Sequence, residues 1–128
     1  MNNKKALVFP LLYMAFIFVL SSIPDNGDGV GRYLFSANVI MQNALHIPLF
    51  GVLALLWAAA LRKNGYSLKK ITKYALIITL LYAVFDEIHQ YFTPGRFASV
   101  TDFFLDSLGC FAGLALYRKF IALKEESS

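Results

Sequence analysis

The residues most able to do chemistry lie between positions 86 and 106. This stretch places four carboxylates, a histidine and an arginine in an otherwise apolar sequence: Asp86, Glu87, His89, Arg96, Asp102 and Asp106. Carboxylates can bind cations or transfer protons, and an arginine can bind a phosphate group. A charge at the centre of a membrane helix costs roughly 2.5 to 3.5 kcal/mol, so charges that persist there usually have a function. The stretch is therefore the candidate site.

The composition indicates a membrane protein. The chain has 128 residues, of which 58% are hydrophobic, and its mean hydropathy is +0.57. Only helices and closed barrels satisfy their own backbone in lipid, and the alternating pattern of barrel strands is absent from the sequence. We predict an all-α membrane protein, a bundle of four transmembrane helices at about 6–23, 39–61, 74–92 and 100–121. We expect these helices to form a single domain over residues 1–128.

Basic residues are distributed unevenly along the chain. Ten of the 12 Lys and Arg residues lie before the first predicted helix, between the second and third, or at the end of the fourth. Only Arg32 and Arg96 fall in the other two connections, at 24–38 and 93–99. Because basic loops stay in the cytoplasm, we predict that both termini are cytoplasmic and that the protein is multi-pass in the bacterial cytoplasmic membrane. Its first partner is then the lipid bilayer, and nucleic acid is not expected, because the basic residues form no patch on a soluble module.

Three predicted helices carry an ionisable side chain at a similar depth. Counted inward at 1.5 Å per residue, His46, Asp86 and Asp106 lie about 9 to 10 Å below the outer ends of their helices. Spacings of three and four residues let Gln90 share a face with either neighbouring carboxylate. We predict a polar pocket about 10 Å deep that opens outward. The candidate ligand-binding residues are His46, Asp86, Glu87, Gln90, Arg96, Asp102 and Asp106.

Each of these residues also has a structural interpretation. Asp102 lies in the first turn of its helix, where a carboxylate complements the helix dipole. Asp106 lies a turn deeper and fits that interpretation less well, while His46 could simply bond a neighbouring helix. Gly109 and Gly113 are predicted to be packing residues, because a Gly-x-x-x-Gly pair allows helices to approach closely in a membrane.

The same stretch resembles a known family. The run Asp86-Glu87-x-x-Gln90-x-Phe92-x-Pro94-Gly95-Arg96, followed by Asp102-x-x-x-Asp106-x-x-Gly109-x-x-x-Gly113, is similar to the VanZ-like family of small bacterial membrane proteins. Ser21-Ser22-Ile23-Pro24 and the segment around His46 also fit its pattern. Two positions differ, since Asn43 and Phe50 stand where the family often has a basic residue and a tyrosine. The resemblance implies a role in the cell envelope and in low-level resistance to glycopeptides of the teicoplanin type.

The charge of the predicted pocket restricts its ligand. Four carboxylates and one guanidinium give a formal charge of −3 while the histidine is neutral. Protonation of some carboxylates, a divalent cation or a positively charged ligand would each reduce this charge. We favour a binding protein that holds a lipid-linked cell-wall precursor or a cationic group of one.

An enzyme is the alternative. In that hypothesis Asp86 and Asp106 hold a divalent cation such as Mg²⁺, His46 acts as general base or acid, and Arg96 binds a phosphate. The reaction would be metal-assisted hydrolysis or transfer on a lipid-linked phosphate. A transporter is disfavoured, because no charged residue continues the site along the helices toward the cytoplasm.

Overall fold

The protein is a bundle of long helices. The computed structural model describes residues 3–25 and 39–127, except for the side chains of residues 39–42. A 3₁₀ turn at Lys4–Leu7 leads into α1 (Val8–Ser21), which is followed by α3 (Val39–Lys63), α4 (Leu68–Tyr91) and α5 (Val100–Glu126). The described residues contain no strand. The predicted all-α class with four main helices is confirmed.

Three helical segments are long and apolar enough to cross a membrane, namely Lys4–Ser21, Asn43–Lys63 and Val100–Glu126. The remaining helix, α4, has 24 residues and therefore a length of about 36 Å, which exceeds the hydrocarbon core. It is not among these three apolar segments, and it has three lysines near its start and two carboxylates near its end. That α4 also crosses the membrane therefore stays a prediction.

Two helices extend further than predicted. α4 begins at Leu68 rather than at residue 74, after Ser67 in an extended conformation, and α5 continues to Glu126 rather than residue 121. The added turns carry lysines and glutamates. Apolar runs delimit only the part of a helix that lipid covers, so the polar turns beyond them were not included in the prediction.

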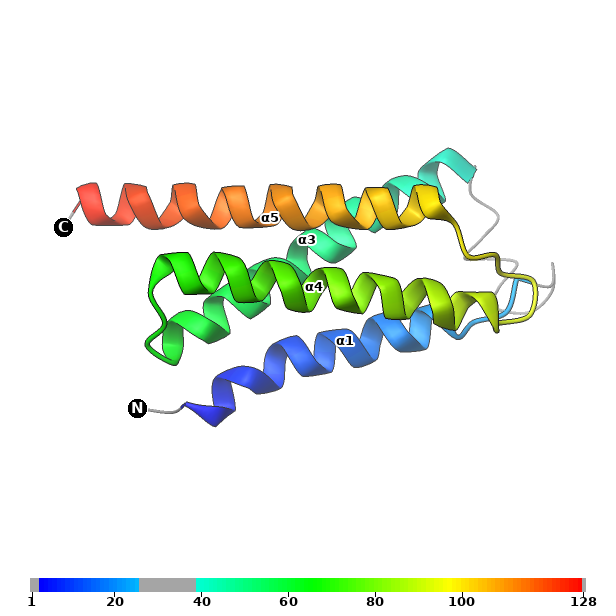
Figure 1. Cartoon of the computed structure of the whole chain (residues 1–128), viewed down its shortest axis with the longest axis horizontal. Coiled ribbons are helices and arrows are strands. Elements are labelled where there is room, and N and C mark those ends of the chain that lie inside the picture. Colours follow the sequence, from blue (N-terminus) through cyan, green and yellow to red (C-terminus); the bar gives the residue numbers. More distant parts are fainter. Residues whose placement is uncertain (1–2, 26–38, 128) are drawn as a thin grey trace.

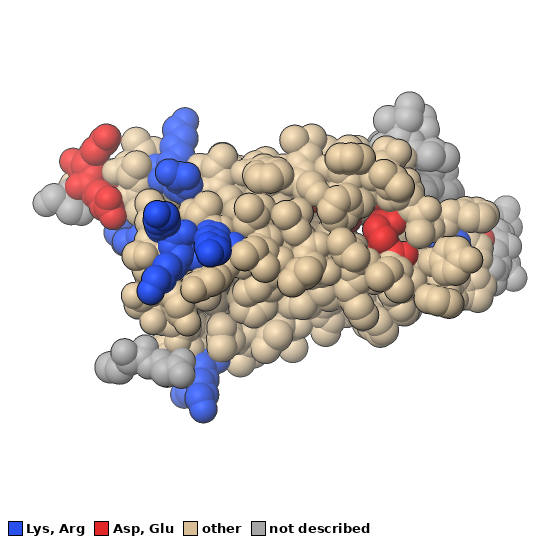
Figure 2. Space-filling model, in the orientation of Figure 1, with Lys and Arg blue, Asp and Glu red and all other residues tan. Residues whose placement is uncertain are grey.

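Consecutive helices run in opposite directions along one long axis (Figure 1). Both termini and the connection between α3 and α4 lie at one end, and the connection between α4 and α5 lies at the other. Figure 2 shows Lys and Arg side chains gathered at the end with the termini. This is the asymmetry on which the predicted cytoplasmic termini rest, and the orientation itself stays a prediction. Arg32, one of the two basic residues assigned to the outer side, lies outside the described residues.

The closest helix contact is between α3 and α5. A Cβ atom added to Gly109 would collide with the carbonyl oxygen of Ile47, and one added to Gly113 would collide with that of Gly51. Both collisions are closer than 3.0 Å, a separation that real Cβ atoms essentially never show. Glycines therefore let these two backbones touch directly one to two turns below Asp106.

The core consists of two groups of buried side chains. One lies between α3, α4 and α5 and includes Ala58, Ile71 and Leu114, and the other lies between α1, α3 and α4 around Phe50. The outside is also apolar, since Leu81 is 66% exposed and Phe104 is 66% exposed. Large apolar side chains on the outer surface are what a lipid-facing bundle requires. The buried polar residues described next are concentrated in the half away from the termini.

Candidate functional site

The last turns of α4 direct two consecutive carboxylates to different neighbours. Adjacent residues in a helix point about 100° apart. Asp86 is 1% exposed and contacts α1, whereas Glu87 is 9% exposed and reaches the start of α5. One helix thus supplies a carboxylate to each of two polar groups.

The first polar group joins α1, α4 and the connection after α4. The hydroxyl of Ser21 donates to Oδ1 of Asp86 at 2.5 Å, and the amide of Gln90 donates to Oδ2 at 2.9 Å. Nη2 of Arg96 in turn donates to Oε1 of Gln90 at 3.2 Å. Both oxygens of the buried Asp86 carboxylate are thereby satisfied by protein donors, as a buried charged group requires. We call these four residues the Asp86 network.

The connection between α4 and α5 is held against α1. The hydroxyl of Thr93 donates to the carbonyl oxygen of Ser21 at 3.2 Å. The backbone N–H of Asp25 donates to the carbonyl oxygen of Pro94 at 3.1 Å. Gly95 adopts φ +74, a left-handed conformation that glycine enters without strain. This turn places Arg96 beside Gln90.

The second polar group joins α3 and α5. Nδ1 of His46 lies 2.8 Å from Oδ1 of Asp106, which is 0% exposed. The glycine contact below fixes the spacing of the two helices, so the distance between these side chains is set by the backbone. His46 and Asp106 therefore form a buried pair that depends on the close approach of α3 and α5.

The start of α5 completes this group. Ser99 is the N-cap residue, and its hydroxyl accepts the N–H of Asp102 at 3.3 Å. The N–H of Ser99 donates to Oε2 of Glu87 at 2.7 Å. A carboxylate is stabilised at a helix N-terminus, where unpaired N–H groups carry a partial positive charge. Glu87 thus links α4 to the first turn of α5.

Three carboxylates in this region keep an oxygen without a hydrogen bond. Oε1 of Glu87, Oδ1 of Asp102 and Oδ2 of Asp106 are buried and accept no hydrogen bond within the described part of the chain. The nearest possible ligand atoms of His46, Glu87 and Asp106 lie within 4.8 Å of one another. We call His46, Glu87, Asp102 and Asp106 the acidic site. A buried carboxylate oxygen is costly unless something positive or hydrogen-bonding contacts it.

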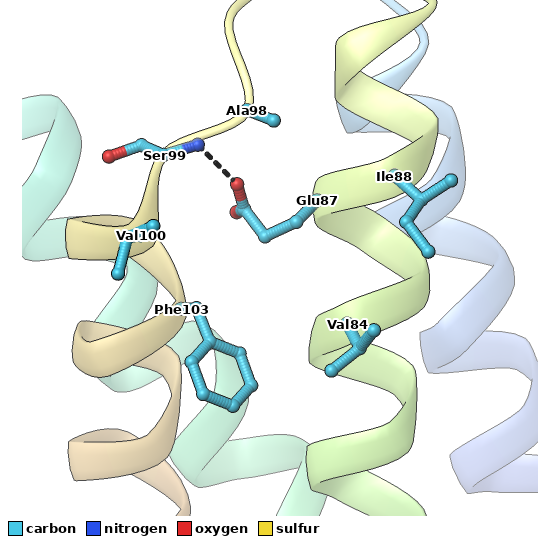
Figure 3. A pocket seen from close by; sticks show the side chains of 7 residues that line it. All are labelled: Val84, Glu87, Ile88, Ala98, Ser99, Val100 and Phe103. Carbon is cyan, nitrogen blue, oxygen red and sulfur yellow. Dashed lines mark hydrogen bonds between the residues drawn. The ribbon is translucent and has the colours of Figure 1, made fainter.

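A cavity of about 260 Å³ opens beside the acidic site, between α4 and α5. Figure 3 shows Glu87 extending from α4 across this cavity toward Ser99, with apolar side chains above and below it. The lining residues are Val84, Glu87, Ile88, Ala98, Ser99, Val100 and Phe103. On the side of the molecule seen in Figure 2, acidic atoms are visible in a hollow of the apolar surface. The cavity is thus an apolar cleft with a carboxylate on its wall.

The structure divides the predicted site residues between the two groups. His46, Glu87 and Asp106 lie together, with Asp102 in the first turn above Asp106. Asp86, Gln90 and Arg96 belong to the Asp86 network. The predicted metal pair of Asp86 and Asp106 stays a prediction, but the hydrogen bonds on both oxygens of Asp86 favour Glu87 as the partner of Asp106.

Two serines at the site were not assigned a role from the sequence. In the sequence, Ser21 belongs only to the family pattern, and Ser99 is not among the predicted site residues. A serine immediately before a helix that begins with a carboxylate in its first turn is an N-cap signal and could have identified Ser99. Nothing in the sequence indicates that Ser21 faces Asp86. His89 bonds Ser22 at 2.8 Å and stacks on Phe18, outside both groups.

Comparison with known proteins agrees with the resemblance seen in the motifs. A family model described as VanZ/LLP1 matches residues 4–123, nearly the whole chain. No curated protein matches the chain, and no solved structure does. Because the match includes both the Asp86 network and the acidic site, the chain belongs to the VanZ/LLP1 family.

Proposed function

We propose that this protein is a multi-pass protein of the bacterial cytoplasmic membrane that crosses it four times, with both termini in the cytoplasm. Three apolar helices, a fourth helix (α4) that runs antiparallel to α3 and α5, and the basic side chains at one end support this arrangement. The acidic site and its cavity would then lie in the outer half of the membrane. A ligand could reach them from the lipid or from the outer surface.

Within this arrangement, the acidic site binds a positively charged group carried by a lipid-linked cell-wall precursor or associated with it. The observation that carries this function is the set of three buried carboxylate oxygens, on Glu87, Asp102 and Asp106, that have no hydrogen bond to any described residue. Three like charges in a medium of low dielectric constant repel one another strongly, and a positive group between them relieves that repulsion. The site is therefore suited to a cation.

The cavity fits a ligand that is itself part of a lipid. Its wall is apolar except at Glu87 and Ser99, and it opens toward the side of the bundle rather than toward the termini. An apolar chain could lie in it while the headgroup reaches the carboxylate of Glu87. Binding would change how the precursor is exposed at the outer surface, and so change the susceptibility of the cell to glycopeptides.

A metal-assisted hydrolase or transferase acting on a lipid-linked phosphate is the second candidate function. It is favoured by the contact of His46 with Asp106 at 2.8 Å, because a carboxylate can orient and polarise an imidazole that acts as a general base. The nucleophile would be a water molecule beside His46. The geometry supports binding better than this reaction, because binding requires only the charges and the cavity.

Complementation of a strain that lacks this gene tests the proposal. Wild-type protein, Glu87→Gln, Asp106→Asn and the remote control Glu126→Gln would be expressed, and the minimum inhibitory concentration of teicoplanin measured. Each variant removes one negative charge, but Glu126 is exposed at the far end of α5. We expect the two site variants to lose the effect on susceptibility while they accumulate normally in the membrane. Wild-type behaviour of both site variants would reject the proposal.

A further inference from the structure

We infer that His46, Glu87 and Asp106 form a binding site for a divalent metal ion. The inference rests on the proposed function and deepens it, because it identifies the positive charge in the acidic site as a metal ion. An ion held there would allow the phosphate of a lipid-linked precursor to approach three carboxylates that would otherwise repel it.

The spacing of the three side chains fits one ion. Their possible ligand atoms all lie within 4.8 Å of one another. When metal–ligand bonds are roughly 2.0 to 2.6 Å long, two ligand atoms on opposite sides of the ion are about 4 to 5 Å apart. Small side-chain rotations are therefore enough to bring the three side chains into coordination. Nδ1 of His46 and Oδ1 of Asp106 are 2.8 Å apart and share a hydrogen bond. A bound ion would replace that proton, and neighbouring ligands of an octahedral ion lie at a similar separation of roughly 3 Å.

The free oxygens provide an observation independent of the spacing. Asp106 is 0% exposed and Glu87 is 9% exposed, yet Oδ2 of Asp106 and Oε1 of Glu87 accept no hydrogen bond within the described residues. Buried carboxylates normally have all their oxygens paired. The oxygen of Asp102 that also lacks a bond lies one turn above Asp106 and could accept a water molecule bound to the ion.

The backbone holds these residues in place before an ion binds. They come from three helices, and the glycine contact between α3 and α5 fixes His46 against Asp106. The N–H of Ser99 holds the other oxygen of Glu87, at 2.7 Å. Hydrogen bonds to the second atom of a ligand group are typical of metal sites, where they orient the ligand. In contrast, both oxygens of the neighbouring Asp86 carboxylate are already hydrogen-bonded.

The donor set indicates the class of metal. Two carboxylates and one imidazole suit borderline to hard divalent ions such as Mn²⁺ and Zn²⁺, and they do not suit the soft ions that prefer thiolate. Mn²⁺ is the more useful probe, because the free ion gives a six-line paramagnetic resonance spectrum that is broadened when the ion binds protein.

The test is a titration of the purified full-length protein with Mn²⁺ after treatment with a chelator. We expect one ion per wild-type chain, and affinity at least about tenfold lower in Glu87→Gln, Asp106→Asn and His46→Ala. Glu126→Gln should bind as wild type does. Each variant would first be checked for an unchanged melting temperature, and Glu87→Gln at the cavity wall carries the test if the other two variants are unstable.

The outcomes separate this inference from the proposed function. If wild type binds no Mn²⁺, or if all site variants bind it as wild type does, the inference is wrong even when Glu87→Gln still abolishes the effect on teicoplanin susceptibility. If the ion binds and depends on these residues, the inference holds. The metal-site inference then holds even if the same variants leave teicoplanin susceptibility unchanged. That result would reject only the proposed function.

Discussion

Replacing Gly109 with alanine should damage both the fold and the acidic site. The new Cβ would collide with the carbonyl oxygen of Ile47, which belongs to the backbone and cannot rotate away. Restoring normal contact requires α3 and α5 to separate by on the order of 1 Å. His46 directly precedes Ile47, so its 2.8 Å contact with Asp106 would lengthen beyond the limit of about 3.5 Å for a hydrogen bond.

The expected loss of stability has two sources. Overpacking of a tight contact costs about 1 to 3 kcal/mol, and leaving a buried polar pair without its hydrogen bond costs a similar amount. A combined loss on the order of 3 kcal/mol corresponds to a decrease of about 10 °C in melting temperature for a chain of this size. Fluorescence of Trp57 in detergent can report it, because that side chain packs against both core clusters.

Two further variants serve as controls for Gly109→Ala. In Gly51→Ala the new Cβ would lie 3.1 Å from the carbonyl oxygen of Gly109, which needs a shift of only a few tenths of an ångström. Its destabilisation should be at most about 1 kcal/mol. Ala112→Val adds its methyl groups on the exposed side of α5 and should change stability by less than about 0.5 kcal/mol. A melting temperature of Gly109→Ala equal to that of wild type, or higher than that of Gly51→Ala, would show that Gly109 does not set the spacing of α3 and α5.

The other predictions concern single hydrogen bonds. Ser21→Ala leaves Oδ1 of Asp86 buried without its donor and should lower stability by about 1 to 3 kcal/mol in the same melting assay. Tyr82→Phe removes a 2.6 Å bond to the backbone of α1 and should cost about 1 kcal/mol, whereas an unchanged melting temperature would mean that the bond contributes nothing. Ser99→Ala removes the N-cap of α5 and should also cost about 1 kcal/mol. His89→Ala should leave teicoplanin susceptibility as in wild type, because the His89 side chain bonds Ser22 and stacks on Phe18, which belong to neither the acidic site nor the Asp86 network.

The helices could be predicted from the sequence because each contains a long apolar run, although only three of these helical segments are apolar enough to cross a membrane by length and composition. Their polar ends could not, since Lys69 and Lys70 in α4 lie outside that run and yet continue the same helix. Common depth on separate helices was enough to predict that His46 and Asp106 would lie near each other. The depth of a residue below the outer end of its helix depends on that helix alone, so it can be predicted from the sequence.

The division of the site into two groups could not be predicted. Asp86 and Glu87 are adjacent, and which neighbour each one faces depends on the rotation of α4 between α1 and α5. That rotation is set by packing of the whole bundle. The sequence therefore placed both carboxylates in one pocket, while Ser21 and Ser99 hold them in separate hydrogen-bond networks.

In its own membrane, the acidic site should hold a positively charged ligand. Native mass spectrometry of the protein, released gently from its own membrane, tests this most directly when wild type is compared with Glu87→Gln and with the control Glu126→Gln. We predict that wild type and the control carry a lipid-linked precursor or a metal ion and that Glu87→Gln has lost it. If all three carry only bulk phospholipid and no metal, the acidic site binds no such ligand and the carboxylates serve the structure alone.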